Sequence, residues 1–136
     1  MQSTIKSNSV YLSKWMIEFA KEIAGGLVMS QNPGKSVQEL RNAYNITQKD
    51  LSELLELRRE TLSRIENGRI NPSSGFVCSI AKIFTLIEAG KVQCEKRGGI
   101  QIPFFNRMSK DFGVSQEKSD AILKIAMDSY NKGEKP

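Results

Sequence analysis

Hydrophobic residues recur every three or four positions near the start of the chain, and charged residues such as Lys14, Glu18 and Lys21 stand between them. An apolar stripe with this period predicts an amphipathic helix over residues 10–29. The turn signal Asn32-Pro33-Gly34 separates this helix from the next element. The members of the stripe are Leu12, Trp15, Met16, Phe19, Ile23 and Leu27.

The middle of the chain has shorter apolar runs, each preceded by a residue that caps helices well. Ser36 followed by Glu39 predicts the start of one helix, and Thr47 followed by Asp50 predicts the start of another. A second short apolar face begins after a break at residues 56–57. This stretch therefore predicts two short helices, joined by a tight turn, that pack on each other. Their apolar faces consist of Leu51, Leu54 and Leu55, and then of Leu62 and Ile65.

Beyond the two short helices the pattern predicts three more. The apolar run at residues 76–87 forms one that closes at Gly90, a short one follows Pro103, and a last one begins after the cap residue Ser115. Residues 91–103 alternate weakly around two glycines, and both a small hairpin and an irregular linker remain open there. The fold class predicted for the chain is all-α.

Residues 112–116 repeat the order of aromatic, turn, branched, cap and glutamine residues found at residues 44–48. A second pair of short helices would need an apolar anchor where Ser119 stands, and a helix with arginines after it. We interpret the repeat as the shared requirements of a turn followed by a helix cap.

The second short helix carries long polar side chains around its start. A helix that is anchored by a neighbour and presents such side chains has the layout of a recognition helix, which enters the major groove of DNA. These side chains are Arg58, Arg59, Glu60, Thr61 and Arg64.

The motif resembles the phage-repressor and Cro-type helix-turn-helix family, also called the XRE family, over residues 36–84. The residues that carry the resemblance are Leu40-Arg41, Thr47-Gln48, Leu51, Leu57, Thr61, Ile65-Glu66-Asn67-Gly68 and Pro72. Residues 22–36 also resemble archaeal predicted transcriptional regulators that have an extra helix before this domain. Two residues depart from the family pattern, because Glu56 replaces its turn glycine and Ser52 its small alanine. A glutamate kept in the left-handed conformation costs about 1 kcal/mol.

The resemblance implies a sequence-specific transcription regulator that binds double-stranded DNA as a homodimer on a palindromic operator. It also implies a five-helix repressor-like domain with additional N- and C-terminal helices. Arg41 is expected to be solvated or directed at the backbone, and Glu66 to make a structural contact near a helix end. The expected base-reading residues are Arg58, Arg59, Glu60 and Arg64, and the expected phosphate contacts are Gln48, Thr61 and Arg69.

These expectations divide the chain into three segments. Residues 1–35 form a tail and a helix, residues 36–90 the DNA-binding domain, and residues 91–136 a linker and helices that serve dimerisation. Aromatic and apolar faces near both ends suit a subunit interface, although the helix at residues 10–29 can also serve as a core helix of its own domain. The last helix is favoured as the main contributor, because the first has the neighbouring five-helix core to pack on. The expected interface residues are Trp15, Phe19, Ile122, Ile125 and Met127.

The charge balance agrees with a polyanionic partner. The chain has 20 lysines and arginines against 15 acidic residues, a formal net charge of +5. This excess alone does not identify nucleic acid, and it becomes informative because arginines lie on the predicted recognition helix.

The residues needed for metal binding or catalysis are scarce. The chain has no histidine and two cysteines, so no zinc-finger spacing can be assembled and no metal or cofactor is expected. Cys78 lies in an apolar pattern and is expected in the core, whereas Cys94 lies in a polar segment and is expected to be exposed. No nucleophile with a base and no phosphate loop is present, so an enzyme is not expected.

The first apolar stretch is interrupted by charges, so no membrane segment is expected and the protein is predicted to be cytoplasmic. A rival interpretation is a protein-interaction adaptor, antitoxin-like or coactivator-like, in which DNA contact is secondary. No residue identifies a small-molecule effector.

Overall fold

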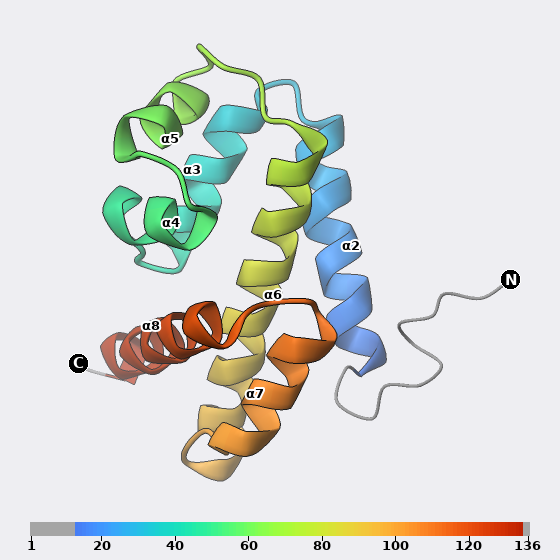
Figure 1. Cartoon of the computed structure of the whole chain (residues 1–136), viewed down its shortest axis with the longest axis vertical. Coiled ribbons are helices and arrows are strands. Elements are labelled where there is room, and N and C mark those ends of the chain that lie inside the picture. Colours follow the sequence, from blue (N-terminus) through green and yellow to red (C-terminus); the bar gives the residue numbers. More distant parts are fainter. Residues whose placement is uncertain (1–12, 135–136) are drawn as a thin grey trace, which may run out of the picture. The chain divides into compact units, whose positions relative to one another are not determined.

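The computed structural model describes residues 13–134, and every regular element within that range is an α-helix (Figure 1), which confirms the all-α class. Residues 10–12 of the first predicted helix lie outside the described residues. The helices are α2 (Lys14–Met29), α3 (Pro33–Ala43), α4 (Gln48–Leu55), α5 (Arg59–Glu66), α6 (Ser74–Arg97), α7 (Ile102–Asp111) and α8 (Gln116–Glu134).

The described residues form two compact units. The first, called the motif unit below, consists of residues 21–81, and the second, called the terminal unit, consists of residues 13–20 and 82–134. The boundary between the units falls inside α2 and inside α6. The functional division into residues 1–35, 36–90 and 91–136 stays a prediction, and its boundary at residue 90 falls inside α6.

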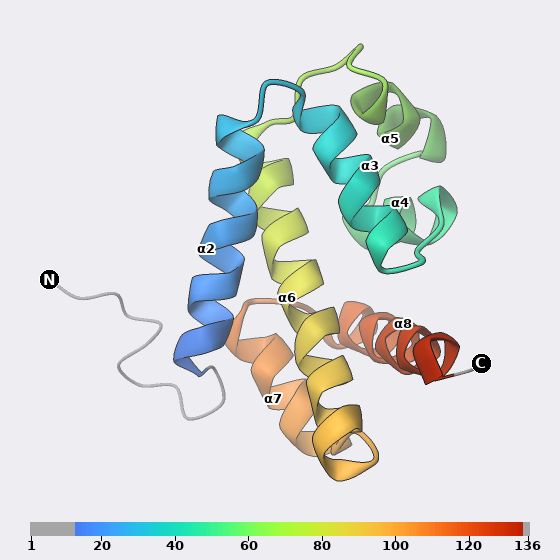
Figure 2. The same ribbon diagram turned by 180° about the vertical axis from the view of Figure 1, so that it is seen from behind.

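In the motif unit, α5 packs against both α3 and α4 (Figures 1 and 2). This packing buries the apolar faces that the sequence predicted, since Leu51 and Leu62 have no exposed surface and Leu54 and Ile65 have 4% and 5%. The two short helices and the turn between them are therefore confirmed.

The start of α3 differs from the prediction. The predicted cap pair Ser36 and Glu39 lies inside the helix, which begins at Pro33. Asn32 caps it instead, because its side chain accepts the Lys35 amide at 3.2 Å and proline suits the first helical position. At the next cap, the prediction was correct: the Thr47 hydroxyl accepts the Asp50 amide at 3.0 Å.

Gly34 explains how closely α3 approaches α5. A Cβ atom at this position would lie 2.0 Å from the Ile65 carbonyl oxygen and 3.0 Å from that of Glu66. Only glycine allows the first turn of α3 to lie directly on the last turn of α5.

Four helices end in the same way. In each, a residue in the left-handed conformation donates its amide to the carbonyl three residues back, and the next residue donates to the carbonyl five residues back. This is the Schellman arrangement, which satisfies carbonyls that a helix end leaves open. The left-handed residues are Asn45 (φ 58°), Glu56 (φ 59°), Gly68 (φ 80°) and Gly113 (φ 78°), at the ends of α3, α4, α5 and α7.

Two predictions are settled by these helix ends. Glu56 keeps the left-handed geometry that the family gives to glycine, so the turn of the motif is not reshaped. The repeat of residues 44–48 at residues 112–116 is a repeated turn and cap, since Ser115 caps α8 as Thr47 caps α4.

In the terminal unit, the second half of α6 lies beside α7 and α8 (Figure 2). These helices bury an apolar core. Phe84, Phe105, Met108 and Ile122 are at most 2% exposed. Gly90 lies inside α6, where an added Cβ would come within 2.7 Å of the Ala126 Cβ. This glycine therefore gives α8 room to pack on α6, and it does not end the helix.

The prediction that α6 ends at Gly90, followed by a hairpin or irregular linker to residue 103, was wrong. The helix continues to Arg97, where Gly98 ends it with a φ of 75°. Apolar residues such as Ile87 and Cys94 keep a seven-residue helical spacing across Gly90, and both are buried. Only residues 98–101 connect α6 to α7.

The two cysteines have the opposite environments from those predicted. Cys94 is buried on the inner face of α6, and Cys78 is exposed near its start. Burial is the main cause that raises the pKa of the Cys94 thiol, and the charge of Glu95 adds to it.

Candidate nucleic-acid interface

The exposed surface of α5 consists largely of the residues predicted to read DNA bases. Arg59 and Glu60 lie in its first turn and Arg64 in its last, and all three are exposed. Glu60 and Arg64 are four residues apart and share the face opposite the buried Leu62 and Ile65. A rigid, anchored helix therefore presents one acidic and two basic side chains to the outside.

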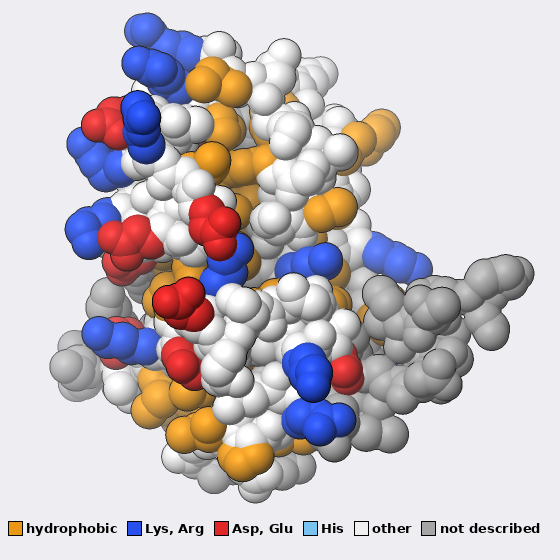
Figure 3. Space-filling view, in the orientation of Figure 1, with side chains coloured by type: hydrophobic (Ala, Val, Ile, Leu, Met, Phe, Trp, Pro, Cys, Tyr) orange, Lys and Arg blue, Asp and Glu red, His pale blue; other side chains and the backbone are white. Residues whose placement is uncertain are grey.

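The remaining predicted DNA contacts lie at the ends of α5. Arg58 occupies the N-cap position in an extended conformation, and its side chain makes no capping bond. Arg69 is exposed just after the left-handed Gly68, whereas Thr61 is half-buried. Figure 3 shows lysine and arginine side chains gathered on the edge of the molecule that carries α5, with acidic side chains among them.

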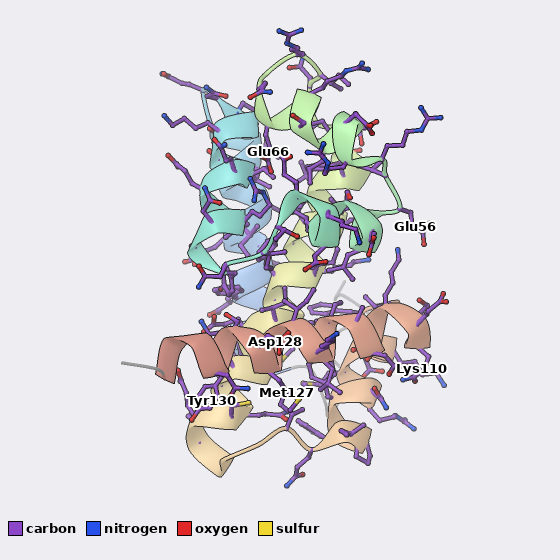
Figure 4. All side chains as sticks on the ribbon, turned by 90° about the vertical axis from the view of Figure 1, so that its left-hand side faces the viewer. Glu56, Glu66, Lys110, Met127, Asp128 and Tyr130 are labelled. Atoms are coloured by element: carbon purple, nitrogen blue, oxygen red, sulfur yellow. The ribbon has the colours of Figure 1, made fainter. Side chains whose placement is uncertain are left out.

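A buried ion pair lies behind this surface. The Glu66 carboxylate, whose side chain is 1% exposed, accepts two hydrogen bonds from the Arg41 guanidinium, at 2.7 Å from Nε and 3.0 Å from Nη2. Arg41 donates a third bond to the Ile46 carbonyl at 3.0 Å. The pair thus joins the end of α5 to α3 and to the turn before α4 (Figure 4 labels Glu66). Bidentate geometry of this kind fixes orientation as well as adding binding energy.

The same carboxylate holds Gln48, the first residue of α4. The Gln48 amide nitrogen donates to Glu66 Oε1 at 2.9 Å, and its oxygen accepts from Arg59 Nη1 at 3.3 Å. Arg59 is therefore tied, through Gln48 and Glu66, to the buried Arg41. A predicted phosphate contact and a predicted base reader are therefore joined by a hydrogen bond.

The sequence predicted the role of Glu66 correctly and that of Arg41 only in part. Arg41 is directed at the backbone of Ile46 as expected, but its side chain is 11% exposed and so is not solvated. The burial of Arg41 could have been predicted from its position in the sequence. Arg41 lies one helical turn after the buried Val37, on the inner face of α3.

On α4, Lys49 follows Gln48 and pairs with Glu53 at 2.9 Å on the exposed side. The hydrogen bond from Lys49 to Glu53, with the charge of that carboxylate, raises the pKa of Lys49. Lys49 is thus engaged along the helix, and the lysine is fully charged at neutral pH.

The residues predicted to form a dimer interface differ in how much of their side chain is exposed. Trp15 is 40% exposed and contacts Phe19 edge to face, with ring centroids 6.1 Å apart, and Met127 is 45% exposed. Ile125 is half-buried. Ile122 has no exposed surface, because it packs inside the terminal unit, so it is not available to a partner.

No group of three acidic or cysteine side chains within residues 13–134 is arranged to hold a metal ion. None of the described helices is both long and apolar enough to cross a membrane.

Comparison with known proteins agrees with this geometry. A family model described as "Helix-turn-helix" matches residues 37–86, which include α4, the turn and α5. The chain belongs to this family of helix-turn-helix transcriptional regulators.

Three curated relatives, all from Archaeoglobus fulgidus, bear the name "Uncharacterized HTH-type transcriptional regulator". One is 31% identical over 68 residues, which cover 47% of this chain and 30% of the relative. The other two are 38% identical over 48 residues, 35% of this chain and 68% and 69% of the relatives. No solved structure matches the chain significantly.

Proposed function

We propose that this protein is a transcription regulator that binds double-stranded DNA sequence-specifically by placing α5 in the major groove. The observation that carries the proposal is the exposed start of α5, where Arg59 is held in place by Gln48 and the buried Glu66. The names of the relatives and the net charge of +5 support it.

The chemistry of the exposed residues suits DNA. An arginine guanidinium matches the two major-groove acceptors of guanine, and a glutamate accepts from the cytosine amino group, so Arg59, Arg64 and Glu60 together offer a sequence code. Arg58 is close enough to the helix start to serve as a further reader. Residues of this kind at the start of a helix contact base edges in helix-turn-helix proteins.

Gln48, Thr61 and Arg69 are proposed to contact the phosphates. Gln48 is the first residue of α4, so its side chain lies at a helix N-terminus, where backbone amides favour an anion. One hydrogen of its amide group is engaged by Glu66, which leaves the other for a phosphate oxygen. Such contacts position the motif on the duplex without reading its sequence.

We further propose that the protein acts as a homodimer on a palindromic operator in the cytoplasm. A single recognition helix reads few base pairs, and two-fold pairing doubles the site with half-sites about 34 Å apart. The segment from residue 91 onward would supply the dimer contacts, and residues 36–90 the DNA contacts. The proposed activity is binding and not catalysis.

Selection of bound fragments from a randomised duplex library tests this function. The protein should enrich one motif with an inverted repeat, and the retained fragments should bind more tightly than the starting pool. If no sequence is enriched and a protein partner co-purifies in equal amount, the adaptor interpretation replaces this one.

A further inference from the structure

A pocket opens between α7 and α8 in the terminal unit, and none of its lining residues is among those assigned to DNA. Its volume is about 350 Å³, which is within the range of small-molecule sites. Its walls come from the last turns of α7, the turn at residue 114 and the first turn of α8. Two of the lining side chains, Arg107 and Lys110, are basic and none is acidic.

Lys110 is the most available of these groups. It is exposed at the end of α7, beside the start of α8 (Figure 4), and its ammonium group carries three donors. The carbonyl ends of α7 do not compete for it, because the amides of Phe112, Gly113 and Val114 already occupy them at 2.8–3.1 Å.

The opposite wall offers further donors. Ser115 caps α8, and its hydroxyl accepts the Lys118 amide at 3.3 Å. The amides of Gln116 and Glu117, in the first turn, have no acceptor within a helix and lie at its positive end.

The floor of the pocket is fixed by a hydroxyl network. Ser119 is 1% exposed, and its Oγ lies 3.0 Å from Asn106 Oδ1 and 2.8 Å from Ser109 Oγ. This anchors the oxygen of the Asn106 amide and leaves its NH₂ group, a donor, on the other side.

We infer that this pocket binds a phosphate group, with Lys110 and Arg107 supplying charge and the first turn of α8 supplying amide donors. The two basic side chains and the lack of an acidic lining residue favour an oxyanion over a cation. The group could belong to a small phosphorylated molecule or to a nucleic acid backbone, and the test separates these sources.

The test uses the amide NMR signals of the full chain. Potassium phosphate is titrated against potassium chloride at equal ionic strength, and the Gln116 and Glu117 amides are followed. The inference expects saturable shifts with phosphate only, and Lys110→Gln should weaken binding about tenfold or more, as expected for one charge-assisted hydrogen bond. Lys124→Gln is the matched control, because Lys124 is exposed on α8 but does not line the pocket.

A second titration uses a short duplex of arbitrary sequence. Saturation of the same amides by the duplex as well as by phosphate would identify backbone phosphate as a source, and saturation by phosphate alone would identify a small ligand. Unsaturable shifts with both probes, or equal behaviour of the Lys110 and Lys124 variants, would overturn the inference. None of these outcomes depends on whether α5 reads DNA, because the readout is confined to α8.

Discussion

At the scale of single residues, a chain of hydrogen bonds runs from Arg41 through Glu66 and Gln48 to Arg59. Two kinds of DNA contact are proposed for the residues at its exposed end. Gln48 is proposed to contact a phosphate, whereas Arg59 and Arg64 are exposed on α5 and are proposed to read bases. Gln48→Ala should therefore weaken binding to all sequences, and the loss of its hydrogen bond to Arg59 should add a smaller loss on the preferred site. Arg59→Ala or Arg64→Ala should cost about 1–3 kcal/mol on the preferred site and relax the preference at one base position. Equal losses on preferred and random duplexes for all three variants, measured by fluorescence anisotropy, would contradict these roles.

Glu56 carries a conformational cost at the turn of the motif. Its φ of 59° and ψ of 41° are those that glycine adopts freely, so Glu56→Gly should stabilise the protein by about 1 kcal/mol in urea unfolding. Glu39→Gly is the matched control, since Glu39 is an exposed glutamate inside α3 and should lose about 1 kcal/mol. A loss of stability in both variants would show that the turn does not hold Glu56 in this conformation.

The buried pair of Arg41 and Glu66 makes a different prediction. Arg41→Met leaves the Glu66 carboxylate buried without its cation, which should cost about 3–5 kcal/mol of unfolding free energy. Arg41→Met combined with Glu66→Leu removes both charges and should recover most of that stability. DNA affinity should not recover, because Gln48 loses its anchor in the double variant.

If the double variant binds the selected duplex as tightly as the unaltered protein, the pair is structural only. If it is no more stable than the single variant, the desolvation argument for the pair is wrong.

Residue environments were predictable where a residue belongs to a recognised motif and less so elsewhere. The roles of Thr47, Glu66 and Gly68 follow from helix capping and from the family phrase. The environments of Cys78 and Cys94 did not follow, because both lie on one long helix whose length was underestimated. A helix that ends at Gly90 leaves Cys94 outside it, so the burial of Cys94 on the inner face of α6 does not follow from that prediction.

At the scale of helices, Gly34 and Gly90 allow neighbouring helices to approach closely, whereas Gly26 has open space around it. Alanine substitutions at Gly34 and Gly26 compare these two situations. Gly34→Ala places a methyl group 2.0 Å from a backbone oxygen of α5, so it should destabilise the protein by about 3 kcal/mol. Gly26→Ala should stabilise it by about 0.5–1 kcal/mol, because Gly26 lies inside α2 with open space around its Cβ position.

The midpoint temperatures of thermal unfolding of the two alanine variants test this. Close packing predicts a lower midpoint for Gly34→Ala, and helix propensity predicts a higher midpoint for Gly26→Ala. A stabilised Gly34→Ala variant would show that α3 and α5 do not approach each other as described.

Most helices could be predicted from the sequence, and the misplaced end of α6 has a tertiary cause. Sequence patterns treat a glycine as a helix end, but Gly90 lies within a helix because a packed neighbour needs the space. Such tertiary requirements are not visible in local spacing. The pocket between α7 and α8 was also missed, since its residues are scattered polar side chains without a motif.

At the scale of the whole molecule, the proposed dimer depends on apolar surface that remains exposed. Light scattering should give a mass about twice the 15.3 kDa of one chain. Met127→Glu should give a monomer, because Met127 is 45% exposed on α8, while the control Met29→Glu, at an 82% exposed position, should remain dimeric. Trp15→Glu should also leave a dimer, since the last helix is proposed as the main contributor.

A monomeric unaltered protein would contradict the dimer. A monomeric Trp15→Glu variant beside a dimeric Met127→Glu variant would move the interface to α2. Truncation before α8 is less informative than these substitutions, because it would remove Ile122 and Ala126 from the core.

The central claim is that α5 reads base sequence in double-stranded DNA. Competition fluorescence anisotropy tests it most directly, with the enriched duplex and a scrambled duplex of the same length and composition at one salt concentration. The account predicts that the enriched duplex binds about a thousandfold more tightly or better, and that Arg59→Ala and Arg64→Ala each reduce this ratio. Equal affinity for the two duplexes would contradict it.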